Sequence, residues 1–232
     1  MPRAKTAKHR RRWTPSELIA ILDAEYGRAQ QQSSGAPVTE LVLTLLSQHT
    51  SDHNSGQAMH RLLERFPGWD DVIAAPTAEV EEAIRPGGLA PTKAPRMQAM
   101  LAEVRERAPD FDLRELAEIP LEEAKAWLRS LPGVGPKTAA CVLLFALARP
   151  ALPVDTHVDR VARRLGLLPR KMSAERAHDR LEAMLAPEQV YAFHVDLIQH
   201  GRRTCHARTP GCERCPLLER CPRVGLPRTA QA

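Results

Sequence analysis

Lys137 and Asp155 are the two residues whose types and spacing could carry chemistry. Lys137 stands in the first turn of a helix that we predict from Pro136 to about Ala148. A cation is disfavoured at a helix N-terminus, so this position favours the neutral amine, which can act as a nucleophile. The alternative role is contact with a phosphate, and it would be the better interpretation of an isolated Gly-x-Gly-x-Lys motif.

Asp155 follows Lys137 by 18 residues and offers the carboxylate that such a nucleophile needs nearby. Pro150 and Pro153 end the preceding helix, and the next helix opens at Val-Asp-Thr-His. Asp155 is then the N-cap of that helix, because Asp is among the preferred caps and the helix dipole keeps its carboxylate ionised. The sequence therefore superimposes two roles on one residue, a helix cap and a catalytic carboxylate.

The stretch before Lys137 predicts two helices joined by a tight hairpin. Residues 120–130 have apolar side chains at three- and four-residue spacing, the pattern of a short helix. Gly133 and Gly135 supply conformational freedom, and Pro136 suits the first position of the next helix. Such a hairpin turns consecutive backbone N–H groups outward, which makes an anion site suited to one phosphate.

These residues resemble the helix-hairpin-helix DNA glycosylases of the endonuclease III family. The resemblance rests on Leu-Pro-Gly-Val-Gly-Pro-Lys-Thr-Ala at 131–139 and Val-Asp-Thr-His-Val-x-Arg-Val at 154–161. It implies that Lys137 attacks C1′ of a damaged nucleoside, and that Asp155 assists proton transfer and stabilises positive charge on the sugar. Adenine-specific relatives lack this lysine, so its presence implies a bifunctional enzyme with lyase activity. The hairpin residues expected to contact DNA are Gly133, Val134, Gly135 and Thr138.

The same resemblance assigns residues of two loops to the gap left by a flipped nucleotide. Gln48 and His49 follow an apolar helix predicted over 38–47, and His49 stands where the family usually has its glutamine. Leu89 matches the second wedge, an apolar side chain pushed between bases. Ala90 stands where the family often carries an aromatic residue. Lys93, further along this segment, is expected to contact a DNA phosphate.

Four cysteines near the C-terminus are the predicted metal ligands: Cys205, Cys212, Cys215 and Cys221. Their close spacing in a chain expected inside the cell argues for metal and against disulfides. Four thiolates suit zinc and an iron–sulfur cluster alike, and the spacing alone favours zinc. The resemblance implies instead a four-iron four-sulfur (4Fe-4S) cluster, with basic side chains around it facing DNA phosphate. These are Arg202, Arg203, Arg208 and Arg214. The fifth cysteine, Cys141, is expected in the core.

The composition is that of a globular chain with a mild positive charge. Its 232 residues, 43% of them hydrophobic, can bury the core of one large or two small domains. Lys and Arg total 33 against 28 acidic residues, and the net charge of +5 is a mild bias toward binding polyanions.

The chain has no apolar run long enough to cross a membrane and no signal-peptide core, so we expect it to be intracellular, cytoplasmic or nucleoid-associated. A nuclear or mitochondrial destination stays open. The basic residues 2–12 form a tail that either supplements DNA binding or is only solvated.

The apolar periodicity predicts an all-α fold. Helices are expected at about 15–28, 38–47, 52–66, 72–84, 97–107, 120–130, 136–148, 155–168, 173–185 and 188–202. Thr14 and Glu17 predict a capping box at the first helix, and the eighth carries a basic face of Arg160, Arg163 and Arg164. The resemblance implies two lobes: a helical barrel at 37–149, and a cluster domain at 150–232 against which residues 1–36 pack. Lys137 and Asp155 would then face each other across the cleft between the lobes.

Together these observations favour a base-excision repair DNA glycosylase with AP lyase activity, acting as a monomer on double-stranded DNA that contains oxidised pyrimidines or abasic sites. Lys137 would displace the base and leave a Schiff base with the sugar, and β-elimination would break the strand 3′ to the lesion. Two alternatives stay open. The changed residues at His49 and Ala90 are compatible with a non-catalytic paralogue that only binds lesions or abasic sites, and a glycosylase for alkylated or mismatched bases would share the same motifs.

Overall fold

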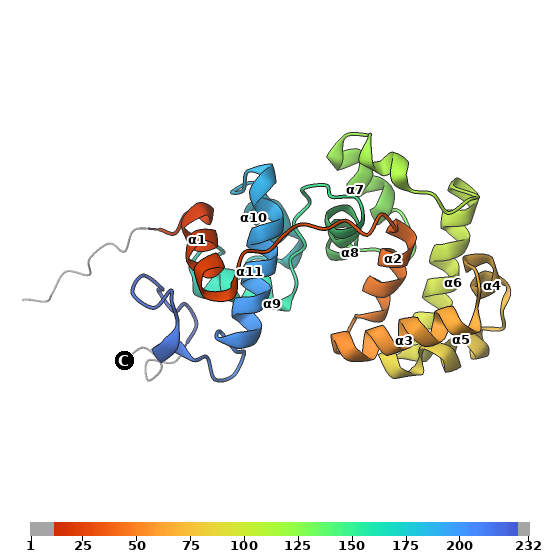
Figure 1. Ribbon diagram of the computed structural model, residues 1–232, viewed down its shortest axis with the longest axis horizontal. Coiled ribbons are helices and arrows are strands. Elements are labelled where there is room, and N and C mark those ends of the chain that lie inside the picture. The colour runs from red at the N-terminus through yellow and green to blue at the C-terminus, as the bar shows by residue number, and fades with distance from the viewer. Residues whose placement is uncertain (1–11, 227–232) are drawn as a thin grey trace, which may run out of the picture. The chain divides into compact units, whose positions relative to one another are not determined.

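The computed structural model describes residues 12–226, and every regular element in that range is a helix (Figure 1). The prediction of an all-α fold is therefore confirmed for this part of the chain. The chain divides into two compact units: Gln31–Pro153, and Met1–Gln30 together with Val154–Ala232. Within the described range, no helix has the length and apolar character needed to cross a membrane. The predicted basic tail at 2–12 lies outside the described residues except for Arg12.

The unit of residues 31–153 is built around α2 (Pro37–Leu46), which packs against α3, α6 and α8. Val38, Leu41 and Leu45 recur at helical spacing and are at most 3% exposed, so this face is completely covered by its neighbours. The other helices of the unit are α3 (Asp52–Arg65), α4 (Trp69–Ala74), α5 (Thr77–Ile84), α6 (Ala90–Arg107), α7 (Leu121–Arg129) and α8 (Pro136–Cys141). Short helical turns occupy Arg85–Gly87 (η1), Arg114–Ala117 (η2) and Val142–Ala146 (η3).

The second unit is centred on α11 (Val190–Arg203), which packs against both α1 (Pro15–Tyr26) and α9 (Thr156–Arg164). It also contains α10 (Ala174–Glu182) and the short turns η4 (Pro187–Gln189) and η5 (Cys212–Arg214). The capping box predicted at α1 is confirmed, because Thr14 Oγ1 accepts from the Glu17 N–H at 3.3 Å and the Glu17 carboxylate accepts from the Thr14 N–H at 3.0 Å. In this unit α1, near the start of the chain, therefore packs on α11, which lies more than 160 residues later in the sequence.

Two of the differences between the predicted and observed helices involve proline, which breaks one helix and is tolerated inside another. The helix predicted at 72–84 is two helices, α4 and α5, because Pro76 holds the preceding Ala75 in an extended conformation with ψ 150°. Conversely, α6 starts at Ala90 rather than at 97 and continues through Pro95. Ala94 and Met97 are fully buried on this helix, so tertiary packing overrides the missing backbone donor of Pro95.

The helix predicted at 136–148 is α-helical only as far as Cys141 and continues as the π-helical turn η3. Cys141 is 4% exposed, which confirms its predicted place in the core.

Candidate functional site

The predicted hairpin joins α7 to α8 at Gly133 and Gly135. Gly133 has φ +76°, a left-handed conformation that favours glycine, and the Val134 N–H closes the turn on the Leu131 carbonyl at 3.2 Å. Gly135 is the N-cap of α8 in an extended conformation, and Pro136 is its first residue. A Cβ atom on Gly133 would lie 3.9 Å from the Arg96 side chain, so an exposed guanidinium borders the hairpin.

Lys137 is the second residue of α8 and is partly exposed. It makes no hydrogen bond or ion pair within the described residues, so its amine is available to a ligand. Val134 and Thr138 beside it are buried, at 7% and 5% exposure, so their side chains are not at the surface.

Glu40 on α2 is the acidic group that interacts with Lys137 within this unit. Burial raises the pKa of the Glu40 carboxyl, and the hydroxyl of Thr44 and the charge of Lys137 offset part of this rise. The Thr44 hydroxyl donates to Glu40 Oε1 at 3.0 Å. No motif in the sequence selects Glu40, because its role depends on how α2 packs against α8.

Asp155 is the N-cap of α9, as predicted. One carboxylate oxygen, Oδ1, accepts from the N–H groups of His157 at 2.9 Å and Val158 at 2.7 Å. The second oxygen, Oδ2, has no hydrogen bond within the described residues. Capping of α9 therefore uses only one of the two carboxylate oxygens, and the other is available for a further role.

The two loops predicted to enter DNA share an uncommon backbone conformation. His49, between α2 and α3, has φ +56°, and Leu89, just before α6, has φ +53°. Both side chains are exposed, Leu89 at 54%, whereas Gln48 is partly buried. Non-glycine residues in the left-handed region cost energy and occur disproportionately at functional sites.

Lys93 does not have the position expected of a phosphate contact, and that prediction was wrong. Its side chain is 3% exposed, and Nζ donates to the carbonyls of Leu46 at 2.7 Å and Gly87 at 2.8 Å. Burial lowers the pKa of the Lys93 ammonium. A buried ammonium with protein acceptors has no surface to offer to DNA.

The predicted basic face of α9 is also wrong. Arg164 is 9% exposed and donates to the carbonyls of His206 at 2.6 Å and Ala207 at 2.8 Å. Arg160 donates to the Cys205 carbonyl at 3.1 Å, and Arg163 is paired with Asp159 on the same helix. These guanidinium groups hold the C-terminal loop and their own helix instead of facing solvent.

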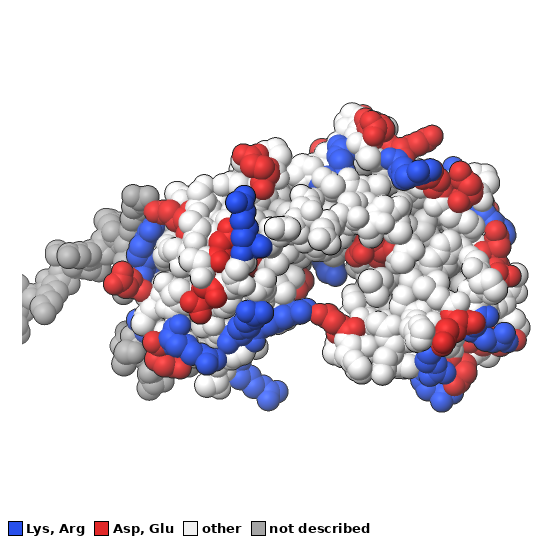
Figure 2. Space-filling view, in the orientation of Figure 1, with Lys and Arg blue, Asp and Glu red and all other residues white. Residues whose placement is uncertain are grey.

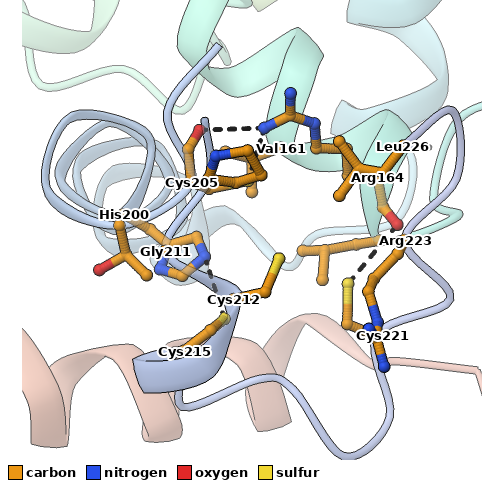
Figure 3. Close-up of a pocket in the computed structure, with 13 residues that line it drawn as sticks. Val161, Arg164, His200, Cys205, Gly211, Cys212, Cys215, Cys221, Arg223 and Leu226 are labelled. Atoms are coloured by element: carbon orange, nitrogen blue, oxygen red, sulfur yellow. Dashed lines mark hydrogen bonds between the residues drawn. The ribbon is translucent and has the colours of Figure 1, made fainter. Parts of the chain in front are cut away.

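All four predicted cysteine ligands line one cavity beside α9 and α11 (Figure 3). Arg164 Nη1 lies 3.2 Å from Cys205 Sγ, and His200 Nε2 lies 3.7 Å from Cys215 Sγ. The other ring nitrogen of His200 is 2.9 Å from the Tyr26 hydroxyl, so His200 is a hydrogen-bonding residue. The cavity is lined mainly by apolar groups such as Val161.

Three of the four thiols in this cavity are costly to ionise. Burial raises the pKa of Cys212 and Cys221 and raises that of Cys215 to about 11. Within residues 12–226, no set of three or more His, Cys, Asp or Glu side chains is arranged to hold a single metal ion. Four thiols around one cavity fit a larger group that brings its own positive charge.

Arg220, next to the last of these cysteines, ties the loop to α1 and was not anticipated from the sequence. Its guanidinium lies 4.0 Å from the centre of the Trp13 ring and donates to Glu17 Oε1 at 3.0 Å. Around the same loop Arg202, Arg203, Arg208 and Arg214 are exposed. Figure 2 shows Lys and Arg side chains gathered along the lower edge of the unit that contains α9 and α11.

An all-helical chain with a lysine directly after a Gly-x-Gly hairpin, a capping aspartate 18 residues later and a four-cysteine loop defines a protein of the helix-hairpin-helix class. Residues 42–187 match the HhH-GPD superfamily of base excision DNA repair proteins. The chain belongs to this superfamily and, within it, to the endonuclease III family. It is a DNA glycosylase/AP lyase that binds DNA containing damaged bases.

Individual relatives support this placement. Endonuclease III of Bacillus subtilis is 33% identical over 185 residues, which cover 80% of each chain. A candidate DNA glycosylase of Arabidopsis thaliana is 38% identical over 162 residues, which are 70% of this chain but only 55% of the Arabidopsis protein. A solved structure of a trapped covalent intermediate of endonuclease III with DNA has a TM-score of 0.76 and 30% identity, covering 91% of this chain and 97% of that one.

Proposed function

We propose that this chain excises oxidised pyrimidines with Lys137 as the nucleophile. The observation that carries the proposal is the partly exposed Lys137, which has no ion pair within the described residues and directly follows the hairpin. The amine attacks C1′ of the sugar, an N–C1′ bond forms, and the bond to the base breaks with its electron pair leaving on the base. The trapped covalent complex of the similar endonuclease III supports this kind of intermediate.

Asp155 serves this reaction through the oxygen that does not cap α9. Its carboxylate assists proton transfer and stabilises positive charge as it develops on the sugar. The sugar ring then opens: the C1′–O4′ bond breaks, O4′ takes a proton, and the lysine nitrogen forms the C1′=N bond of a Schiff base. Removal of a proton from C2′ then expels the 3′ phosphate, which is β-elimination. His49 and Leu89 fill the gap left by the flipped nucleotide, and their exposure and left-handed backbone support this role.

The four cysteines that line the cavity hold a 4Fe-4S cluster in this proposal. The supporting observation is chemical: the buried thiols resist ionisation alone, and positively charged iron favours the thiolate form. When bound, the cluster orders the loop that carries the exposed arginines. Arg164 and Arg220 position the two ends of this loop against α9 and α1.

The test is borohydride trapping on a duplex that carries an abasic site or an oxidised pyrimidine. The parent protein should give a covalent complex, because borohydride reduces a Schiff base, and Lys137→Gln should give none while still binding DNA. Lys171→Gln, at an exposed position, is the matched control and should trap like the parent. Equal trapping by Lys137→Gln would assign the chemistry to another amine. Absence of trapping by the parent would favour a non-catalytic protein that binds abasic sites.

A further inference from the structure

Lys93 connects the two loops that carry His49 and Leu89. Its Nζ atom donates to the carbonyls of Leu46 at 2.7 Å and Gly87 at 2.8 Å. Leu46 is the last residue of α2 and stands three residues before His49, and Gly87 stands two residues before Leu89. The ammonium group of Lys93 is therefore hydrogen-bonded to the backbone just before each of the two loop residues.

Two further contacts strengthen this connection. The backbone N–H of Lys93 donates to the Leu89 carbonyl at 2.9 Å, which is the first helical hydrogen bond of α6. Gly87 approaches α2 so closely that a Cβ atom there would lie 3.7 Å from the Leu46 carbonyl oxygen and 3.2 Å from the Ala58 side chain. The two loop bases are thus in close contact, and Lys93 is bonded to both.

The chemistry of this contact explains why a lysine suits it. The last carbonyls of an α-helix lack partners within the helix, and the Leu46 carbonyl receives one from outside. A hydrogen bond from a charged donor is stronger than one between neutral groups, and the low polarity around a side chain only 3% exposed strengthens it further. Without Lys93, both carbonyls would be buried without this donor.

We propose that Lys93 is a positioning residue that couples the two loops, so that insertion of one loop into DNA favours insertion of the other. The inference rests on the proposed function, in which His49 and Leu89 fill the gap left by the flipped nucleotide. The coupling is a property of the pair of loops, and it is distinct from the affinity that either loop contributes alone.

The experiment is a double-mutant cycle on binding to a duplex with a reduced, uncleavable abasic site. Affinities are measured for the parent, His49→Ala, Leu89→Ala and the double variant, and the same set is made with Lys93→Met. In the parent set the two loops should be coupled by roughly 3- to 10-fold in Kd. In the Lys93→Met set the coupling factor in Kd should be about 1, which means that the effects of the two loop substitutions on the free energy of binding simply add.

Three companion variants make the result specific. Lys93→Arg keeps charged donors and should restore the coupling. Arg105→Met removes an exposed cation from the same helix, where Arg105 pairs with Asp70 at 3.1 Å, and should leave the coupling unchanged. Lys93→Gln keeps an uncharged donor on a shorter side chain and replaces Lys93→Met in the cycle if the methionine variant does not fold.

The outcomes separate the inference from the proposed function. Single variants that each weaken binding, with equal coupling in the presence and absence of Lys93, would overturn the inference and leave the function of the loops intact. Single variants that bind like the parent would overturn the proposed role of the loops, and the inference with it. Coupling that is lost equally in Arg105→Met would also overturn the inference.

Discussion

Replacing Asp196 with asparagine should stabilise the unit that contains α1 and α11, and the gain should grow as the pH rises. Asp196 is 0% exposed, and neither carboxylate oxygen has a hydrogen-bond partner within the described residues. Burial raises the pKa of Asp196 to about 7, and the charge of Asp23 on α1 adds to the rise. Asn has nearly the same shape and no charge at any pH, so it removes the cost of ionisation.

The sign and size follow from the difference between the folded and unfolded states. The folded pKa of about 7 lies above the ordinary value of 3.8, so the folded state holds the proton more tightly. The stability linked to this proton is fully present below pH 3.8 and is lost as the pH rises through 7. A difference of 3.2 pH units at 1.36 kcal/mol each corresponds to about 4 kcal/mol at high pH, as an order of magnitude.

The assay is the free energy of unfolding in urea at several values between pH 5 and pH 9, for the parent and Asp196→Asn. The stability of the parent should fall relative to that of the variant most steeply at the acidic end of this range, between pH 5 and about pH 6, and the difference should level off above pH 7. Asp179→Asn, at an exposed position of α10, is the control and should keep a nearly constant difference from the parent. A constant difference between the parent and Asp196→Asn would refute the reasoning, because it would show that Asp196 does not change its protonation over this range.

Three other changes test the proposed site. Asp155→Asn should keep the hydrogen bonds to the His157 and Val158 N–H groups and change the free energy of unfolding by at most about 1 kcal/mol. It should nevertheless slow single-turnover base release by roughly 100- to 10,000-fold. A variant that melts at a far lower temperature but releases base at the parent rate would make Asp155 only a cap. The purified protein should be yellow-brown and contain about four irons per chain. Cys212→Ser should lose both this colour and its solubility. A colourless parent protein that contains one zinc would contradict the proposed cluster. Glu40→Gln removes an acidic group that interacts with Lys137, so at a fixed neutral pH it should raise the rate of borohydride trapping by roughly 2- to 10-fold while DNA binding is kept. An unchanged rate would mean that Glu40 does not influence the amine.

Features of the chain that depend on a few neighbouring residues were predictable from the sequence. The capping box of Thr14 and Glu17, the cap at Asp155 and the break at Gly133 each use contacts within about three residues, so their residue types identify them. The prediction of a single helix at 72–84 is wrong for a reason that is also local, because Pro76 restricts the preceding Ala75 to an extended conformation.

Contacts between distant segments could not be predicted in the same way. Lys93 and Arg164 look like surface cations in the sequence, but one binds carbonyls 47 and 6 residues away and the other binds a loop more than 40 residues away. A single chain gives no sign of which basic side chains turn inward, because burial depends on how helices pack. Asp196 and Glu40 could not be selected from the sequence for the same reason, since their raised pKa values come chiefly from burial.

Helix α9 connects Asp155 to the cysteine loop, so the position of each depends on the position of the other. Asp155 caps its first turn, and Arg164 at its last residue holds the His206 and Ala207 carbonyls of the loop. Nine helical residues span about 13 Å and behave as a short rigid rod. Loss of order in the loop would therefore free one end of the rod and disturb the direction in which the carboxylate at the other end is presented.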